Sequence, residues 1–155
     1  MTSTIENRLT ELNLTLPAVA KPVAAYIPAK RSGNLVFTSG QLPTVYGQLI
    51  AEGILGVDVE VEQAYACAKQ CALNALAAIK EVIGDLDKVS QIVKVTGYVA
   101  SHPSFTNQSA VVNGASELLA EIFGARAHHA RSSIGMAALP LNAPVEIELI
   151  VEVTD

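Results

Sequence analysis

Hydrophobic and polar positions alternate with two periods along this chain, one typical of helices and one typical of strands. Apolar residues recur every three or four positions across residues 59–83 and 107–123, and a glycine follows each segment. Residues 91–100, 131–139 and 145–153 are apolar and rich in β-branched side chains, as strands are. The pattern predicts two long helices and three strands, with Asp58 capping the first helix.

The N-terminal part predicts a short helix and a hairpin. Residues 3–12 place Ser3 and Glu6 as a capping box, before Pro17 and Pro22 interrupt the pattern. Residues 24–30 and 34–40 flank the turn sequence RSG, which predicts a hairpin with Tyr26 in its first strand. The glycine-rich residues 41–57 read as a loop with at most one short strand.

This order of elements indicates a single α+β domain over residues 1–155, in which residues 1–16 form an N-terminal helical extension. We expect a mixed sheet with the two long helices packed on one face. The other face of the sheet would then remain exposed unless another subunit covers it. Only 16% of the residues are charged and 50% are hydrophobic, which favours a homo-oligomer.

Composition also narrows the function. The net charge is −5 and the ten Lys and Arg residues are scattered, which argues against nucleic-acid binding. No apolar stretch is long enough to span a membrane, and the N-terminus lacks the features of a signal peptide, so a cytoplasmic protein is expected. Cys67 and Cys71 are the only cysteines, and we interpret them as core residues rather than metal ligands.

Arg131 is the strongest candidate for chemistry, because it is a permanent charge in an otherwise apolar strand. Its planar guanidinium matches a carboxylate at two points, although pairing with a nearby Glu is an alternative. In the last strand, Glu146, Glu148 and Glu152 share one face, which could equally be a solvated face. If the last two strands form a simple hairpin, Arg131 and Glu146 lie about 23 Å apart. They could then share a site only through a different strand pairing or a second chain.

Weaker candidates surround these two residues. Ser39 and Gly40 end a predicted strand, where glycine permits a close approach of a ligand. Asn113 lies in the second long helix, where it could hold a loop instead. His128 and His129 could move protons near neutral pH or lie in an exposed loop.

Three segments together resemble the RidA family, also called the YjgF family: NLVFTSGQLP, ARSSIGMAALP and PVEIELIVEV. The resemblance covers roughly residues 20–153. It implies a chorismate-mutase-like fold, a homotrimer with ligand clefts between subunits, and hydrolytic deamination of enamines and imines such as 2-aminoacrylate to 2-keto acids and ammonia. It implies no cofactor and no metal.

The resemblance also assigns roles to residues. Arg131 matches the arginine that pairs with the substrate carboxylate, and Glu146 matches the glutamate near the attacking water. Substrate-lining positions match the residues Tyr26, Ser39, Gly40, Asn113 and Ser133.

This chain departs from the family pattern at several positions. Ser133 stands where the family often has cysteine, so its backbone N–H is expected to matter most. Gly135 replaces a frequent acidic residue, and the connection at 101–108 is longer than usual. These departures leave a non-enzymatic carboxylate-binding or regulatory protein as the alternative. A ribonuclease or translation inhibitor is disfavoured by the acidic charge.

Overall fold

The computed structural model describes residues 3–19, 21–22 and 24–155, so Met1 and Thr2 of the predicted extension lie outside the described residues. In chain order the helices and strands are α1 (Thr4–Glu11), β1 (Ala29–Ser32), β2 (Leu35–Thr38), β3 (Thr44–Val45), β4 (Gln48–Leu49), α2 (Val61–Ile83), β5 (Val89–Ala100), α3 (Gln108–Phe123), β6 (Ala130–Met136) and β7 (Val145–Val153). Short 3₁₀ turns precede β5, follow α3 and precede β7. Within the described residues, no helix has the length and apolar character that crossing a bilayer requires.

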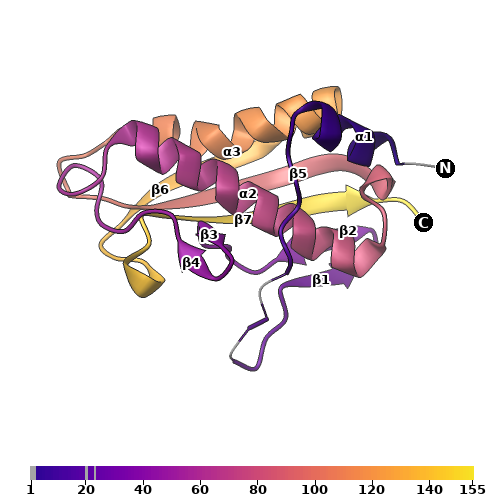
Figure 1. The fold of residues 1–155 in the computed structure, drawn as a ribbon, viewed down its shortest axis with the longest axis horizontal. Coiled ribbons are helices and arrows are strands. Elements are labelled where there is room, and N and C mark those ends of the chain that lie inside the picture. The colour runs from indigo at the N-terminus through magenta and orange to yellow at the C-terminus, as the bar shows by residue number, and fades with distance from the viewer. Residues whose placement is uncertain (1–2, 20, 23) are drawn as a thin grey trace.

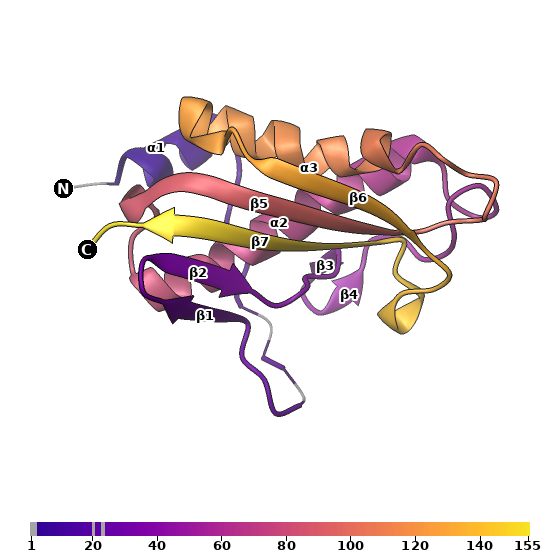
Figure 2. The ribbon, with the colours of Figure 1, turned by 180° about the vertical axis from the view of Figure 1, so that it is seen from behind.

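Five strands form one mixed sheet in the order β1-β2-β7-β5-β6. Only the β5–β6 pair is parallel. Helices α2 and α3 lie on one face of the sheet (Figure 1), and the view from behind shows the other face bare (Figure 2). The predicted mixed sheet with two long helices on one face is therefore confirmed.

The last two strands do not form a hairpin, because β5 lies between β6 and β7. A parallel pair needs a long crossover connection, and α3 supplies it between β5 and β6. After β6 the chain crosses the end of β5 through the turn at Pro140–Asn142 and enters β7 on the other side of β5.

The N-terminal predictions need three corrections. Tyr26 precedes β1 rather than lying in it, because Pro28 has no N–H to pair and the ladder starts at Ala29. The loop at 41–57 contains a two-stranded ribbon, β3–β4. Glu60, not Asp58, caps α2 in a capping box with Gln63, while the Asp58 carboxylate accepts a hydrogen bond from the backbone N–H of Ile54 at 3.1 Å.

The core depends on a close approach of α3 to its neighbours. A Cβ at Gly97 of β5 would collide with the side chain of Val112, and a Cβ at Gly114 would collide with the backbone carbonyl of Tyr65 in α2. Helix α2 contributes many small buried residues, alanines above all, which allow this short spacing. Both glycines therefore fix the height and the lateral position of α3 over the sheet.

Asp87 provides one of the attachments of helix α1 to the body of the domain. The carboxylate of Asp87 accepts hydrogen bonds from the hydroxyl of Ser3 and from the backbone N–H groups of Thr4 and Ile5, each at 2.8 Å. Ile5 and Leu9 are buried in the common core. The extension is thus an integral part of the domain.

Replacing Asp87 with Asn should weaken this attachment and lower the free energy of unfolding by about 1 kcal/mol, the usual size of a helix-cap contribution. Burial acts to raise the pKa of Asp87, but the hydrogen bonds from Ile5, Thr4 and Ser3 bring it below the ordinary value of 3.8. The stabilisation is therefore full above that ordinary value and is lost as the pH falls through the lower, native-state pKa. Urea unfolding of both proteins between pH 7 and 2.5 measures this, and a constant difference across that range would contradict the assignment.

Candidate functional site

Arg131 lies on the helix-covered side of the edge strand β6. It pairs in register with Val95, which is buried, so its side chain points toward α3. Its Nη1 donates to Oδ1 of Asn113 at 2.8 Å and to Oγ of Ser116 at 3.2 Å. Its other two nitrogens make no hydrogen bond within the described part of the chain, and no ion pair there involves it. The guanidinium is therefore oriented by neutral groups and keeps donors for a ligand.

Ser116 was missed at the level of sequence. It lies one helical turn after Asn113, so the two polar side chains share a stripe of α3 that faces the edge strand. Two polar residues at this spacing, with apolar neighbours in the same helix, could have indicated Ser116 from the sequence.

Ser133 follows Arg131 on the same side of β6. It pairs with Gly97, and its hydroxyl oxygen is buried without a hydrogen-bond partner among the described residues. We call Arg131, Asn113 and Ser133 the arginine cluster. A buried hydroxyl without a partner is costly in a native core, and among the described residues only Ser133 carries such a side-chain atom.

The two histidines next to β6 differ in environment. His128 is exposed and His129 is half-buried. Burial lowers the pKa of His129, and the charges of Arg131 and His128 lower it further, although the Ala130 carbonyl acts in the opposite direction. His129 is therefore mostly neutral at pH 7.

Glu146 lies on the bare face of the sheet. It alternates with the buried residues Val145 and Ile147. Reciprocal backbone hydrogen bonds between Gln41 and Ile147, at 2.8 and 3.1 Å, hold Gly40 against its carboxylate, so that a Cβ at Gly40 would collide with it. Burial raises the pKa of Glu146, and the charge of Glu148 raises it further.

Tyr26 and Ser39 lie near Gly40 in the chain, and Glu146 does not line the hollow that they share. They line one shallow hollow of about 470 Å³, together with Lys30 and Phe37. The Ser39 hydroxyl donates to the carbonyl oxygen of Ile27 at 2.6 Å, which fixes the segment before β1. We call Tyr26, Ser39, Gly40 and Glu146 the glutamate cluster.

The structure does not bring the two clusters together within one chain. Arg131 is opposite Val95 on one side of β5, and Glu146 is opposite Tyr98 on the other. Their side chains point to opposite faces of the sheet, because Val95 is buried under the helices whereas Glu146 lies on the bare face. A single site containing both requires residues from two copies.

Tyr98 and Glu148 are two further polar residues of the bare face, and the sequence interpretation did not single out Tyr98. The Tyr98 hydroxyl donates to Oε1 of Glu148 at 2.8 Å. This hydrogen bond, together with burial, raises the pKa of Tyr98 to about 12. Glu148 is thereby held close enough to influence the titration of Glu146.

The thiols and acidic groups of the described residues form no group of three or more that could hold a metal ion. Cys67 and Cys71 are free and buried, and burial raises the pKa of Cys67 to about 11. Both cysteines are core residues, as expected.

Replacing Glu148 with Gln should lower the pKa of Glu146, because the substitution removes the neighbouring negative charge and leaves only the effect of burial. Carboxyl ¹³C chemical shifts of Glu146, followed from pH 3 to 8, measure the change. Glu152→Gln on the same strand is the control and should leave that titration in place. An unchanged Glu146 pKa in Glu148→Gln would show that the two carboxylates do not interact.

Comparison with known proteins agrees with this architecture. The family model described as "YjgF/chorismate mutase-like, putative endoribonuclease" matches residues 6–153. Protein TCP17 of Trypanosoma cruzi is 40% identical over 148 residues, covering 95% of this chain and 92% of that protein. The 2-iminobutanoate/2-iminopropanoate deaminase of Dermatophagoides farinae is 30% identical over 138 residues, covering 89% and 93% of the two chains. A crystal structure of the protein Atu1372, of unknown function, from Agrobacterium tumefaciens is 47% identical, with a TM-score of 0.91 over 97% of this chain and 93% of that one. The chain belongs to the YjgF/RidA family.

Proposed function

We propose that this protein hydrolyses carboxylate-bearing enamines and imines, of the 2-aminoacrylate type, to 2-keto acids and ammonia. The observation that carries this proposal is Arg131, which neutral side chains hold in place and which keeps free donors. A planar guanidinium in this state suits a carboxylate, which it can bind through two parallel hydrogen bonds. A relative that bears the name of such a deaminase supports the same reaction class.

The glutamate cluster supplies the second requirement of the reaction. Water adds to the carbon of the C=N bond, and the resulting carbinolamine loses ammonia once its nitrogen is protonated. Burial and the charge of Glu148 raise the pKa of Glu146, which favours its use to orient the water and to pass a proton between oxygen and nitrogen. The imine is already electrophilic, and orientation therefore provides much of the acceleration.

Both requirements meet only in an assembly, and we propose a homotrimer with its clefts between subunits. Large apolar side chains on the bare face support an interface there, among them Phe37 and Ile134, each 41% exposed. A ring of copies places the edge strand of one subunit near the bare face of the next. The cytoplasm, where amino-acid chemistry produces such imines, is the proposed location.

A non-enzymatic carboxylate-binding or regulatory protein is the second candidate. The separation of Arg131 and Glu146 on opposite faces favours it, because one chain by itself offers a carboxylate anchor without a proton donor. The two functions differ in one measurable respect, which is turnover above the spontaneous hydrolysis of the imine.

Arg131→Ala should lower kcat/KM for 2-aminoacrylate hydrolysis at least about 100-fold, because two charge-assisted hydrogen bonds to the substrate are lost. Glu146→Gln should lower kcat by about 100-fold and leave KM nearly unchanged. Release of 2-keto acid from freshly generated imine, corrected for the buffer rate, measures both. Arg31→Ala is the matched control, since Arg31 pairs with the exposed Asp155 and lies outside both clusters. Wild-type protein that gives no acceleration, yet binds pyruvate through Arg131, would establish the binding protein instead.

Mixing the two inactive variants tests the shared site. If each site takes Arg131 from one subunit and Glu146 from the next, random trimers of Arg131→Ala and Glu146→Gln contain intact sites in about a quarter of positions. Subunits exchanged at equal concentration should therefore recover about 25% of wild-type activity by this arithmetic. Absence of recovery, with mixed trimers confirmed by native mass spectrometry, would place both residues in separate functions.

A further inference from the structure

A cavity of about 580 Å³ lies between α2, the β3–β4 ribbon and the segment that follows α1. Residues 15–19 of this segment, which we call the N-terminal strap, run across α2 next to the ribbon (Figure 1). The volume is within the range of small-molecule sites. No residue of the arginine cluster or of the glutamate cluster lines this cavity, which we call the strap cavity.

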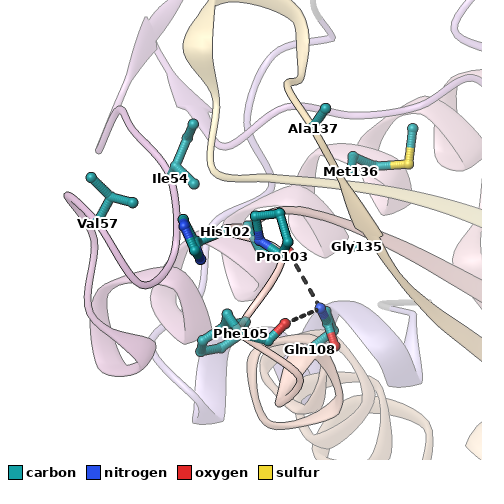
Figure 3. Close-up of a pocket in the computed structure, with 10 residues that line it drawn as sticks. Ile54, Val57, His102, Pro103, Phe105, Gln108, Gly135, Met136 and Ala137 are labelled. Atoms are coloured by element: carbon teal, nitrogen blue, oxygen red, sulfur yellow. Dashed lines mark hydrogen bonds between the residues drawn. The ribbon is translucent and has the colours of Figure 1, made fainter.

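The cavity at the C-terminal end of β6 offers less to a ligand (Figure 3). There the side-chain amide of Gln108 already donates to the Phe105 carbonyl at 2.8 Å and to Ser101 at 3.3 Å, as the dashed lines show. Of its lining residues, only His102 can carry a charge. The strap cavity, in contrast, combines apolar surface with a permanent cation.

Asn74 fixes the ribbon on the α2 side of the strap cavity. Its Nδ2 donates to the carbonyl oxygens of Leu42 and Thr44 at 2.9 and 3.1 Å, which holds the ribbon against the helix. Gln70, one helical turn earlier, donates from Nε2 to Oδ1 of Asn74 at 3.1 Å. Oε1 of Gln70 accepts no hydrogen bond within the described part of the chain, so this side of the cavity is preformed and keeps an acceptor for a ligand.

The strap is held in place by its side chains. Leu16 and Val19 pack against the core, as Leu14 does just before them. No hydrogen bond among the described residues involves positions 15–19, and Pro17 has no N–H to donate. A wall without backbone hydrogen bonds opens at low cost, so a ligand can enter between the strap and the ribbon.

Tyr46 adopts a conformation that is unfavourable for its residue type. It occupies the first position of the two-residue turn between β3 and β4 with a φ of 50°, and Gly47 follows with a φ of 77°. Positive φ at both positions defines a type I′ turn, in which asparagine is preferred at the first position and a bulky side chain costs free energy. The ring lines the strap cavity and is 100% exposed, so no burial offsets this cost. Strain of this kind is typical of functional positions.

Lys21 supplies the charge of the strap cavity. It is exposed, it is the only charged side chain among the described residues of the lining, and none of their ion pairs involves it. Lys21 and Tyr46 therefore lie at the mouth, whereas Leu16 and Val19 are half-buried and supply apolar surface further inside. A ligand that matches this distribution has an apolar body and one anionic group at its end.

We propose that the strap cavity binds a small apolar organic acid, whose carboxylate pairs with Lys21 and whose body lies between the strap and the β3–β4 ribbon. An aromatic body suits this position, because the ring of Tyr46 can stack on it and gain the contact that it lacks in the free chain. The site is separate from Arg131. It requires neither the proposed imine hydrolysis nor a second subunit.

Isothermal titration calorimetry with indole-3-butyrate tests the proposal in the Arg131→Ala protein, from which the proposed carboxylate site of β6 has been removed. This protein should bind one indole-3-butyrate per chain. Its affinity for the acid should exceed that for the uncharged indole-3-butyramide about threefold, because only the acid pairs with the exposed Lys21. No saturable binding, or equal affinities for the acid and the amide, would overturn the proposal whatever the imine assay shows.

Two lysine variants locate the carboxylate. In the same background, Lys21→Gln should weaken binding of the acid about threefold and leave binding of the amide unchanged. Lys30→Gln is the matched control, because Lys30 is also exposed but lines the hollow of Tyr26. An unchanged Kd in Lys21→Gln would overturn the proposal, and a loss confined to Lys30→Gln would place the ligand in that hollow instead.

Tyr46→Asn separates a binding role of this tyrosine from a structural one. Asparagine is preferred at its position of the turn, so the variant should unfold at the same temperature as its Arg131→Ala parent or at a higher one. Its affinity for the acid and for the amide should fall at least about threefold, because the contact between aromatic rings is lost. Unchanged affinities would overturn the placement of the ligand against the ribbon, whatever the unfolding temperature.

Discussion

The short distance between α3 and its two neighbours is the constraint on which the rest of this structure depends. Gly97 admits Val112 against β5, and Gly114 admits the backbone of α2. Asn113 lies between these two contacts in sequence, so it has little freedom except to face the edge strand, where it meets Arg131. A helix even slightly higher above the sheet would separate the amide from the guanidinium. The arrangement of the arginine cluster is thus a consequence of packing, and a rigid element supplies the precision that a carboxylate anchor needs.

Strand alternation imposes a second consequence. Strand β5 separates β6 from β7. Arg131 is paired with Val95 and Glu146 with Tyr98, and these two positions of β5 face opposite sides of the sheet. No rotamer can therefore bring Arg131 and Glu146 to one ligand inside a single chain. The bare face also carries apolar side chains that are exposed to solvent in a single chain, including Phe37 and Ile134. The closed ring proposed above would satisfy both conditions, because each edge strand would meet the face of the next copy. The burial that stabilises such a ring would then also complete its sites.

The sequence allowed most of the fold to be predicted, because long helices and buried strands have strong periods. It placed α2, α3, β5 and β7 to within a few residues, and it identified the mixed sheet. It failed where local signals compete. Asp58 is a good cap by type, yet its carboxylate closes the loop at Ile54, and Pro28 shortened the first strand and left Tyr26 outside it. The order in which the strands pair could not be predicted, because the same two final strands are compatible with a hairpin and with a parallel crossover. A cavity lined by Ile54, Phe105 and Gly135 combines residues from three distant segments, which no local pattern could connect.

The positions of the glycines connect the packing of this domain to the proposed chemistry. Gly97, Gly114 and Gly40 each lie against a group that must stay where it is: the side chain of Val112, the backbone of α2 and the carboxylate of Glu146. A side chain at any of them would move part of the proposed chemistry. Gly135 lies instead against Gln108 and Ser101, which belong to neither cluster. The packing of the core and the placement of both clusters therefore depend on the same feature, because Gly97 and Gly114 set the position of α3 and Gly40 lies against Glu146.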